Sequence, residues 1–151
     1  MANIVPDSFK AELLAGSHNF EYGVSAQTFK LALYVTTLGP PYTTSSTTYS
    51  VTNEVSSVGT GYSAGGNNLT LDTLSGSIPG SNTAIVDFVN LTFSSVTLTA
   101  LGAAIYNSST TPANMLCLVL DFGGNKTATS GDFTIQFPSP TAADAIIRLG
   151  D

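Results

Sequence analysis

Apolar and polar residues alternate with a period of two along much of this chain, which is the pattern of half-buried β-strands. Residues 28–35 show it most clearly, because phenylalanine, leucine and valine occupy every second position while Lys30, Ala32 and Tyr34 lie between them. Residues 133–137 alternate in the same way, whereas residues 115–122 are apolar at almost every position, as in a central strand covered on both faces. Further strands are predicted at residues 49–55, 68–74, 84–93, 96–101 continuing into 104–106, and 145–149.

The amino-terminal segment predicts a single helix. Residues 6–8 form a capping cluster, Phe9, Leu13 and Leu14 recur at helical spacing, and Gly16 is suited to close the helix. The helix is expected to be short, about two turns. Ile4 and Val5 precede it as an apolar arm that gains its order by packing either on its own domain or on a neighbour.

Short strands separated by Gly, Asn, Ser and Pro turns are typical of a sandwich or barrel. We therefore expect one domain over residues 1–151, an all-β, antiparallel β-sandwich that is jelly-roll-like, with about eight strands and an arm and helix over residues 1–16. Residues 36–48 include Pro40 and Pro41 and are expected to form an exposed loop, because consecutive prolines remove the donors of a β-ladder. Residues 123–125, Gly-Gly-Asn, predict a turn between strands.

The composition leaves few groups for catalysis. Only 9% of the residues are charged, against roughly 25% in an average soluble domain. The net charge is −6, and Lys10, Lys30, Lys126 and Arg148 are the only cations, so a phosphate backbone has no basic stripe to bind. An apolar surface of this kind is often covered by a partner, which favours assembly.

Residues 61–65, Gly-Tyr-Ser-Ala-Gly, match the nucleophile elbow in which a strained turn presents a serine hydroxyl. No helical pattern follows Ser63, and the only histidine, His18, precedes it, against the order of that fold. A glycine-rich turn between strands is the favoured interpretation. The sequence accordingly predicts no catalytic residue and no enzyme.

Other reactive side chains also favour structural roles. His18 has no second histidine or cysteine at metal spacing and is expected at the surface or as a cap after the helix. Cys117 lies in the apolar run and is interpreted as a core residue, with Val119 on one face of the strand and Leu118 on the other. Asp87 and Asp121 are interpreted as solvent-facing or turn-facing carboxylates. No metal and no cofactor are predicted.

The amino terminus lacks the cationic start and apolar stretch of a signal peptide, and no run approaches the ~20 apolar residues of a membrane span. We expect a chain made in a cytoplasm, with neither nucleic acid nor a membrane as partner.

Six blocks of the sequence together resemble a family of small virion proteins of tailed bacteriophages. The blocks are PDSFKAELLAGSHNF (6–20), FKLALY (29–34), YSVTNEV (49–55), GTGYSAGG (59–66), AAIYN (103–107) and LDFGGNK (120–126). The resemblance covers most of the chain and implies a non-enzymatic structural protein of the virion. It provides no catalytic residue that could be carried over to this sequence.

The resemblance and the composition together predict an assembly subunit. The first hypothesis is a capsid decoration or cement protein that binds the major capsid protein or another virion protein and forms a homo-oligomer, possibly a trimer. The alternatives are a neck or tail appendage that contacts a receptor, or a carbohydrate-binding module, for which Tyr42, Tyr49 and Tyr62 are the available stacking platforms. The interface candidates are Ile4, Val5, Phe9, Leu13 and Tyr42.

Overall fold

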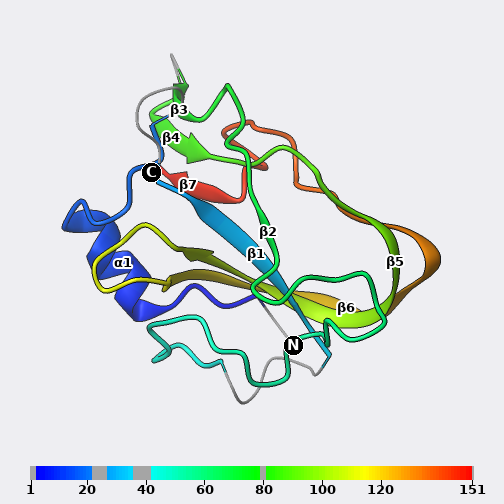
Figure 1. Cartoon of the computed structure of the whole chain (residues 1–151). Helices are drawn as coiled ribbons and strands as arrows, with labels where there is room; N and C mark the ends of the chain where they lie inside the picture. Colours follow the sequence, from blue (N-terminus) through cyan, green and yellow to red (C-terminus); the bar gives the residue numbers. More distant parts are fainter. Residues whose placement is uncertain (1–2, 22–26, 36–41, 79–80, 151) are drawn as a thin grey trace.

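A computed structural model describes residues 3–21, 27–35, 42–78 and 81–150. Over these residues the chain is mostly β, with antiparallel sheets and one short helix (Figure 1). The all-β expectation and its single amino-terminal helix are confirmed at this level. The helix, α1, is Asp7–Leu14, with Pro6 at its amino-terminal cap and Gly16 in the left-handed region just past its end.

The larger sheet contains four strands in the order β2-β1-β5-β6. Their bounds are β1 Phe29–Tyr34, β2 Asn67–Asn68, β5 Leu91–Asn107 and β6 Met115–Ile135. The strand predicted from the alternation at residues 28–35 is confirmed as β1. The predicted strands at 96–101 and 104–106 are parts of one long strand, β5, and those at 115–122 and 133–137 both begin within β6.

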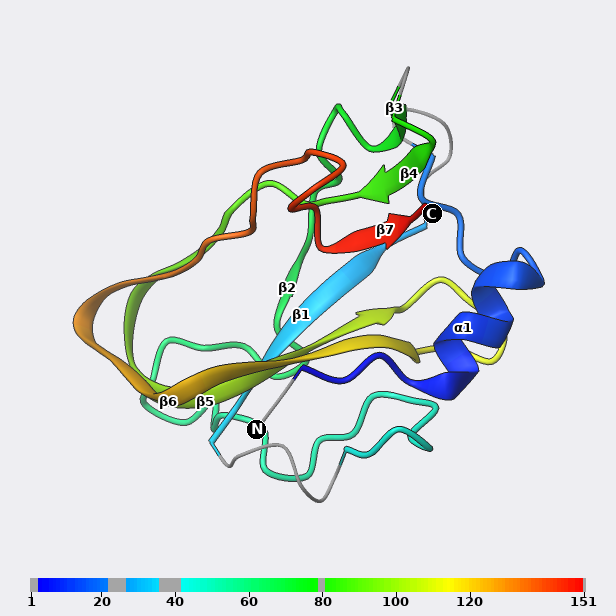
Figure 2. The same cartoon turned by 180° about the vertical axis from the view of Figure 1, so that it is seen from behind.

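The smaller sheet contains three strands in the order β3-β4-β7. Their bounds are β3 Gly76–Ile78, β4 Thr83–Val86 and β7 Ile147–Leu149. Both pairings are antiparallel. The strand order places β7 at one edge of this sheet, beside β4 (Figures 1 and 2).

Three of the predicted strands are wrong in extent. Residues 68–74 contain only the last residue of β2, Asn68, and an isolated bridge between Leu71 and Phe88. Residues 49–55 contain no strand. Their only β-pairing with β1 is the isolated bridge between Glu54 and Tyr34, and Asn53 has a positive φ of 63° that interrupts extended backbone. Residues 84–93 divide into β4 and the start of β5, because residues 87–90 leave one sheet before the chain enters the other. Of the predicted loop at 36–48, residues 36–41 lie outside the described residues. Residues 42–48 contain no strand, and their only β-pairing is the isolated bridge from Thr48 to Met115.

The predicted turn at residues 123–125 is also wrong. These residues lie inside β6, where the register passes from Gly102 opposite Asp121 to Ala100 opposite Lys126. Residues 122–125 therefore stand opposite Leu101 alone, and they form a large bulge in a continuous strand pair. Gly123, with φ 71°, supplies the conformation that the bulge requires.

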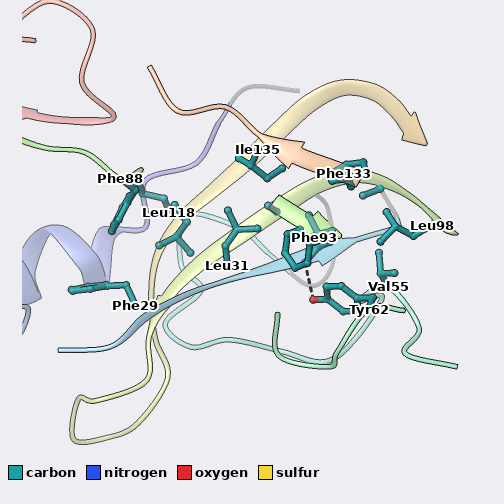
Figure 3. Close-up of a cluster of buried hydrophobic side chains, with 14 of the residues drawn as sticks. Phe29, Leu31, Val55, Tyr62, Phe88, Phe93, Leu98, Leu118, Phe133 and Ile135 are labelled. Atoms are coloured by element: carbon teal, nitrogen blue, oxygen red, sulfur yellow. Dashed lines mark hydrogen bonds between the residues drawn. The ribbon is translucent and has the colours of Figure 1, made fainter. Parts of the chain in front are cut away.

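The larger sheet is covered on both faces. One face carries the main hydrophobic core, to which β1, β5 and β6 contribute Leu31, Phe93 and Leu118 (Figure 3). Residues from loops, among them Val55 and Phe88, close this core from the other side (Figure 3). The opposite face carries a second cluster, which contains Ala32, Tyr34, Tyr42, Ala104, Tyr106, Leu116 and Val119.

β6 is the edge strand of its sheet rather than a central one, although it is buried on both faces at its start as predicted. Two short segments of the same chain cover its outer edge. Ile4 exchanges both backbone hydrogen bonds with Val119, at 2.8 and 2.9 Å, and Leu116 N–H donates to the Thr47 carbonyl at 3.0 Å. Of the two alternatives for the amino-terminal arm, Ile4 therefore packs on its own domain, where it protects a sheet edge.

Candidate functional site

An open apolar groove of about 660 Å³ lies between α1 and the carboxy-terminal segment. Both ribbon views place α1 and the chain's carboxy-terminal end on the same side of the molecule (Figures 1 and 2). The groove is lined by Val5, Phe9, Lys10, Leu13, Leu14, Thr83, Leu118, Ala142, Ile146, Ile147, Arg148, Leu149 and Gly150.

The helix provides one wall of this groove. Phe9 points into the core and is 2% exposed, whereas Leu14 is 90% exposed at the groove's margin. The Lys10 ammonium is 2.9 Å from the Asp7 carboxylate one turn earlier, an exposed pair of the kind that contributes little to stability. Glu12, on another side of the helix, contacts His18 and so fixes α1 to the body of the protein.

Strand β7 provides the opposite wall. It pairs with β4 through Ile147 opposite Val86 and Leu149 opposite Ala84. No strand among the described residues pairs with its other edge. Leu149 is 57% exposed, and the Arg148 guanidinium donates a hydrogen bond to the Ala143 carbonyl oxygen.

Three of the five interface candidates line this groove: Val5, Phe9 and Leu13. Val5 is exposed, Leu13 is half-buried, and Phe9 forms part of the groove's floor. Ile4 does not line it, because its backbone is engaged with Val119 at the β6 edge. The groove therefore includes part of the predicted arm, at Val5, and part of the predicted helix, at Phe9 and Leu13.

Tyr42 is buried, so the expectation of an exposed aromatic side chain at this position is wrong. Its hydroxyl lies 2.7 Å from the Tyr34 hydroxyl and accepts a hydrogen bond from Ser50 N–H at 2.8 Å. These polar partners allow both tyrosines to be buried on the second face of the large sheet. Burial, reinforced by the contact with Tyr42, raises the pKa of Tyr34 well above its usual range.

Glu54 lies among the other described tyrosines, Tyr49, Tyr62 and Tyr106. Its carboxylate accepts hydrogen bonds from the Tyr49 hydroxyl at 2.5 Å, the Tyr62 hydroxyl at 2.6 Å and Gly65 N–H at 2.6 Å. Tyr49 stacks on Tyr106 with ring centroids 4.5 Å apart. Burial, followed by the charge of Glu54, raises the pKa of Tyr106 to about 12. Two of the three tyrosines considered for sugar stacking, Tyr49 and Tyr62, are thus held by a carboxylate, and Tyr62 is only 3% exposed.

His18 is buried, which corrects the prediction of a surface or capping position. Its Nε2 lies 2.9 Å from Glu12 Oε2, and Asn107 Nδ2 donates to its Nδ1 at 3.1 Å. Phe9 packs against the imidazole at a centroid distance of 5.1 Å. Both ring nitrogens are engaged and the imidazole is buried, so His18 connects α1 to β5.

Ser63 lies exposed on the turn that precedes β2, and no helix follows it among the described residues. The glycine-rich turn that the sequence favoured is confirmed: Gly61 and Gly65 both have positive φ. A Cβ added at Gly66 would lie 1.8 Å from the Leu31 carbonyl oxygen, so the turn sits directly against β1. The close packing of the turn against β1 explains why glycines occur here, and no nucleophilic role for Ser63 is needed to explain them.

Cys117 is 1% exposed, as predicted, and burial raises the pKa of its thiol far above the usual range. The predicted facing of the strand is only partly correct. A register shift between Ile105 and Tyr106 places Cys117 in the main core with Leu118, while Val119 belongs to the second cluster. A bulge of this kind turns two successive side chains to one face.

Asp87 is 0% exposed, so its predicted solvent-facing position is wrong. Its Oδ1 accepts the Phe88 N–H at 2.8 Å, while Oδ2 has no hydrogen-bond partner within the usual geometric limits. Burial therefore raises the pKa of this carboxyl. Asp121 is partly exposed, and its Oδ1 accepts the Gly123 N–H at 2.8 Å, a turn-like contact within the bulge of β6.

Sequence reasoning missed the carboxy-terminal wall of the groove and the polar networks around Glu54 and His18. The groove's cations, Lys10 and Arg148, lie far apart in the sequence, and no local signal joins them. Within the described ranges, no group of three or more His, Cys, Asp or Glu side chains is placed to hold a metal ion. No helix among the described residues is long and apolar enough to span a membrane.

Comparison of the chain with models of known protein families, with curated proteins and with solved structures finds no match.

Proposed function

We propose that this protein is a non-enzymatic structural subunit of a tailed-phage virion, in the first place a capsid decoration or cement protein. The resemblance of the six sequence blocks supports the phage assignment. The observation that carries a docking role is the open groove between α1 and β7, which leaves apolar side chains exposed on a chain with few charges.

The proposed fold is a β-sandwich in which the smaller sheet covers part of the main core. Partly buried residues of β4 and β7, namely Val86 and Ile147, pack against that core and support this arrangement. The jelly-roll connectivity and the eighth strand stay predictions. A module whose large sheet is covered on both faces and that has an open groove beside α1 is suited to a repeated contact on a larger surface.

The proposed partner is the major capsid protein or another virion protein, and the protein itself is proposed to form a small homo-oligomer such as a trimer. We place it in the virion after synthesis in the host cytoplasm, with no role for nucleic acid or membrane. A carbohydrate-binding role is less well supported, because Tyr42 and Tyr62 are buried and Tyr49 is bonded to Glu54.

A density map of the intact particle that carries this protein tests the proposal. We expect many copies distributed over the shell, with α1 and β7 facing a neighbouring protein. A few copies at one vertex or along the tail would instead assign the protein to the neck or tail. Absence from purified particles would overturn the structural role.

An assay on the isolated protein tests the non-enzymatic part of the proposal. A panel of ester and glycoside substrates is incubated with the wild type and with Ser63→Ala. We expect no turnover that disappears in the variant. Turnover that depends on Ser63 would contradict both the function and our interpretation of the turn.

A further inference from the structure

We propose that the groove between α1 and β7 binds an extended segment of another protein, rich in alternating apolar and acidic side chains, which adds as a strand to the free edge of β7. The inference rests on the proposed function only for the identity of the partner, a second virion protein. The mode of binding follows from the sheet edge, the apolar lining and the charge of the groove.

The sheet edge is the first argument. An edge strand presents backbone N–H and C=O groups that another chain can pair with, and proteins usually cover such edges. This chain covers the edge of β6 with Ile4 and with residues 47–49. Among the described residues nothing equivalent pairs with the outer edge of β7, although Ile147, Arg148 and Leu149 all line the groove. Every residue of this edge strand therefore contributes to the groove.

The shape and polarity of the groove are the second argument. A strand wall on one side and a helix wall on the other leave a slot that suits an extended peptide, as in other cases of strand addition. Side chains of such a peptide point alternately to opposite sides, so every second one faces the floor. That floor is apolar, formed by Phe9, Leu118 and Ile146, while Leu14 and Leu149 rise exposed at the margins.

The charge of the groove decides the chemistry of the occupant. Lys10 and Arg148 are two of the four cations in a chain of net charge −6. None of the described residues that line the groove is acidic, and Lys10 forms only an exposed pair with Asp7, which lies outside the lining. Among the described residues no carboxylate forms an ion pair with Arg148, and its hydrogen-bond acceptor is the neutral Ala143 carbonyl. A second copy of this chain brings a further six negative charges to the complex. An acidic segment of a different protein makes better use of these cations.

Selection from a displayed library of random octapeptides tests the proposal on the intact protein. We expect enriched peptides with apolar residues at alternate positions and Asp or Glu between them. The double variant Lys10→Glu, Arg148→Glu should bind the best synthetic octapeptide at least about tenfold more weakly and should lose the preference for acidic residues. Lys126→Glu is the matched control, because it reverses a cation outside the groove and should change neither result.

Amide hydrogen exchange of the protein with and without that octapeptide tests the strand addition. We expect slower exchange in residues 147–149 on binding, and loss of binding when a proline replaces the central residue of the peptide. Enrichment of helical or proline-rich peptides, binding that the double variant leaves unchanged, or no enrichment at all would each overturn the proposal. A particle map that shows docking through another surface would overturn this inference alone, whereas acidic peptide binding by a protein absent from particles would overturn only the proposed function.

Discussion

Glu12 and His18 meet at 2.9 Å between Oε2 and Nε2, across the turn that ends helix α1. The imidazole is fully buried, and the carboxylate side chain is 17% exposed. On its far side the ring accepts a hydrogen bond from Asn107 of β5, so a single buried histidine connects the helix to the large sheet. Because α1 forms one wall of the groove, this contact also holds the candidate docking surface in place.

Replacement of His18 by alanine should destabilise the protein. The change leaves a cavity beside Phe9 and removes the ring partner of Glu12, so we expect a loss of ~2 to 4 kcal/mol in the free energy of unfolding. Glu12→Gln is the control, since an amide keeps a hydrogen-bonding group beside the ring, and it should cost less. Urea unfolding followed by circular dichroism measures both. A change below ~0.5 kcal/mol for His18→Ala would contradict the buried position.

Glu54 should be among the most sensitive polar residues, because its carboxylate accepts three hydrogen bonds in a half-buried setting. Glu54→Leu leaves these donors without partners, and we expect a loss of ~2 to 4 kcal/mol in unfolding free energy. Tyr49→Phe removes only one of the donors and should cost ~1 kcal/mol. Denaturant unfolding of the two variants gives the comparison, and equal small losses would show that the network does not hold the segment against β1.

Substitutions at two residues of the main core, Leu118 and Cys117, should destabilise the protein. Leu118→Ala should cost ~2 to 5 kcal/mol through lost burial and the cavity that it leaves. Cys117→Ser should also destabilise, since it buries a hydroxyl in an apolar cluster. Cys117 should react with a thiol reagent only after unfolding, because burial raises the pKa of its thiol and blocks access. Rapid reaction of the native protein would contradict the placement of β6.

Asp87 should make stability depend on pH. Burial raises the pKa of its carboxyl in the folded state, so as pH rises from about 4 the unfolded chain loses this proton first. The contribution of the group to stability is therefore greatest below its unfolded pKa and is lost as pH rises through its folded pKa. Asp87→Asn removes this dependence, and its stability relative to wild type should increase with pH. Unfolding curves of both proteins between pH 4 and 7 test this, and a constant difference would contradict it.

The sequence determined those features that local periodicity encodes. The alternation in residues 28–35 predicted β1 with its two faces, and the apolar run around Cys117 predicted burial on both sides. The capping residues, the spacing of Phe9 and Leu13, and Gly16 predicted α1 with nearly its observed bounds. In each case neighbouring residues within one or two turns, or along one strand, carry the whole signal, so no distant contact is needed.

Only the tertiary structure decided which polar groups are buried and what covers each edge. His18 and Asn107 are 89 residues apart, and the groove joins Lys10 to Arg148. Some partners of the buried polar groups lie close in the sequence, such as Glu12 for His18 and Tyr49 for Glu54, but they do not by themselves predict burial. A local pattern tells which face of a segment is apolar, whereas the groups that reach the second nitrogen of His18 and close the edge of β6 come from residues far along the chain.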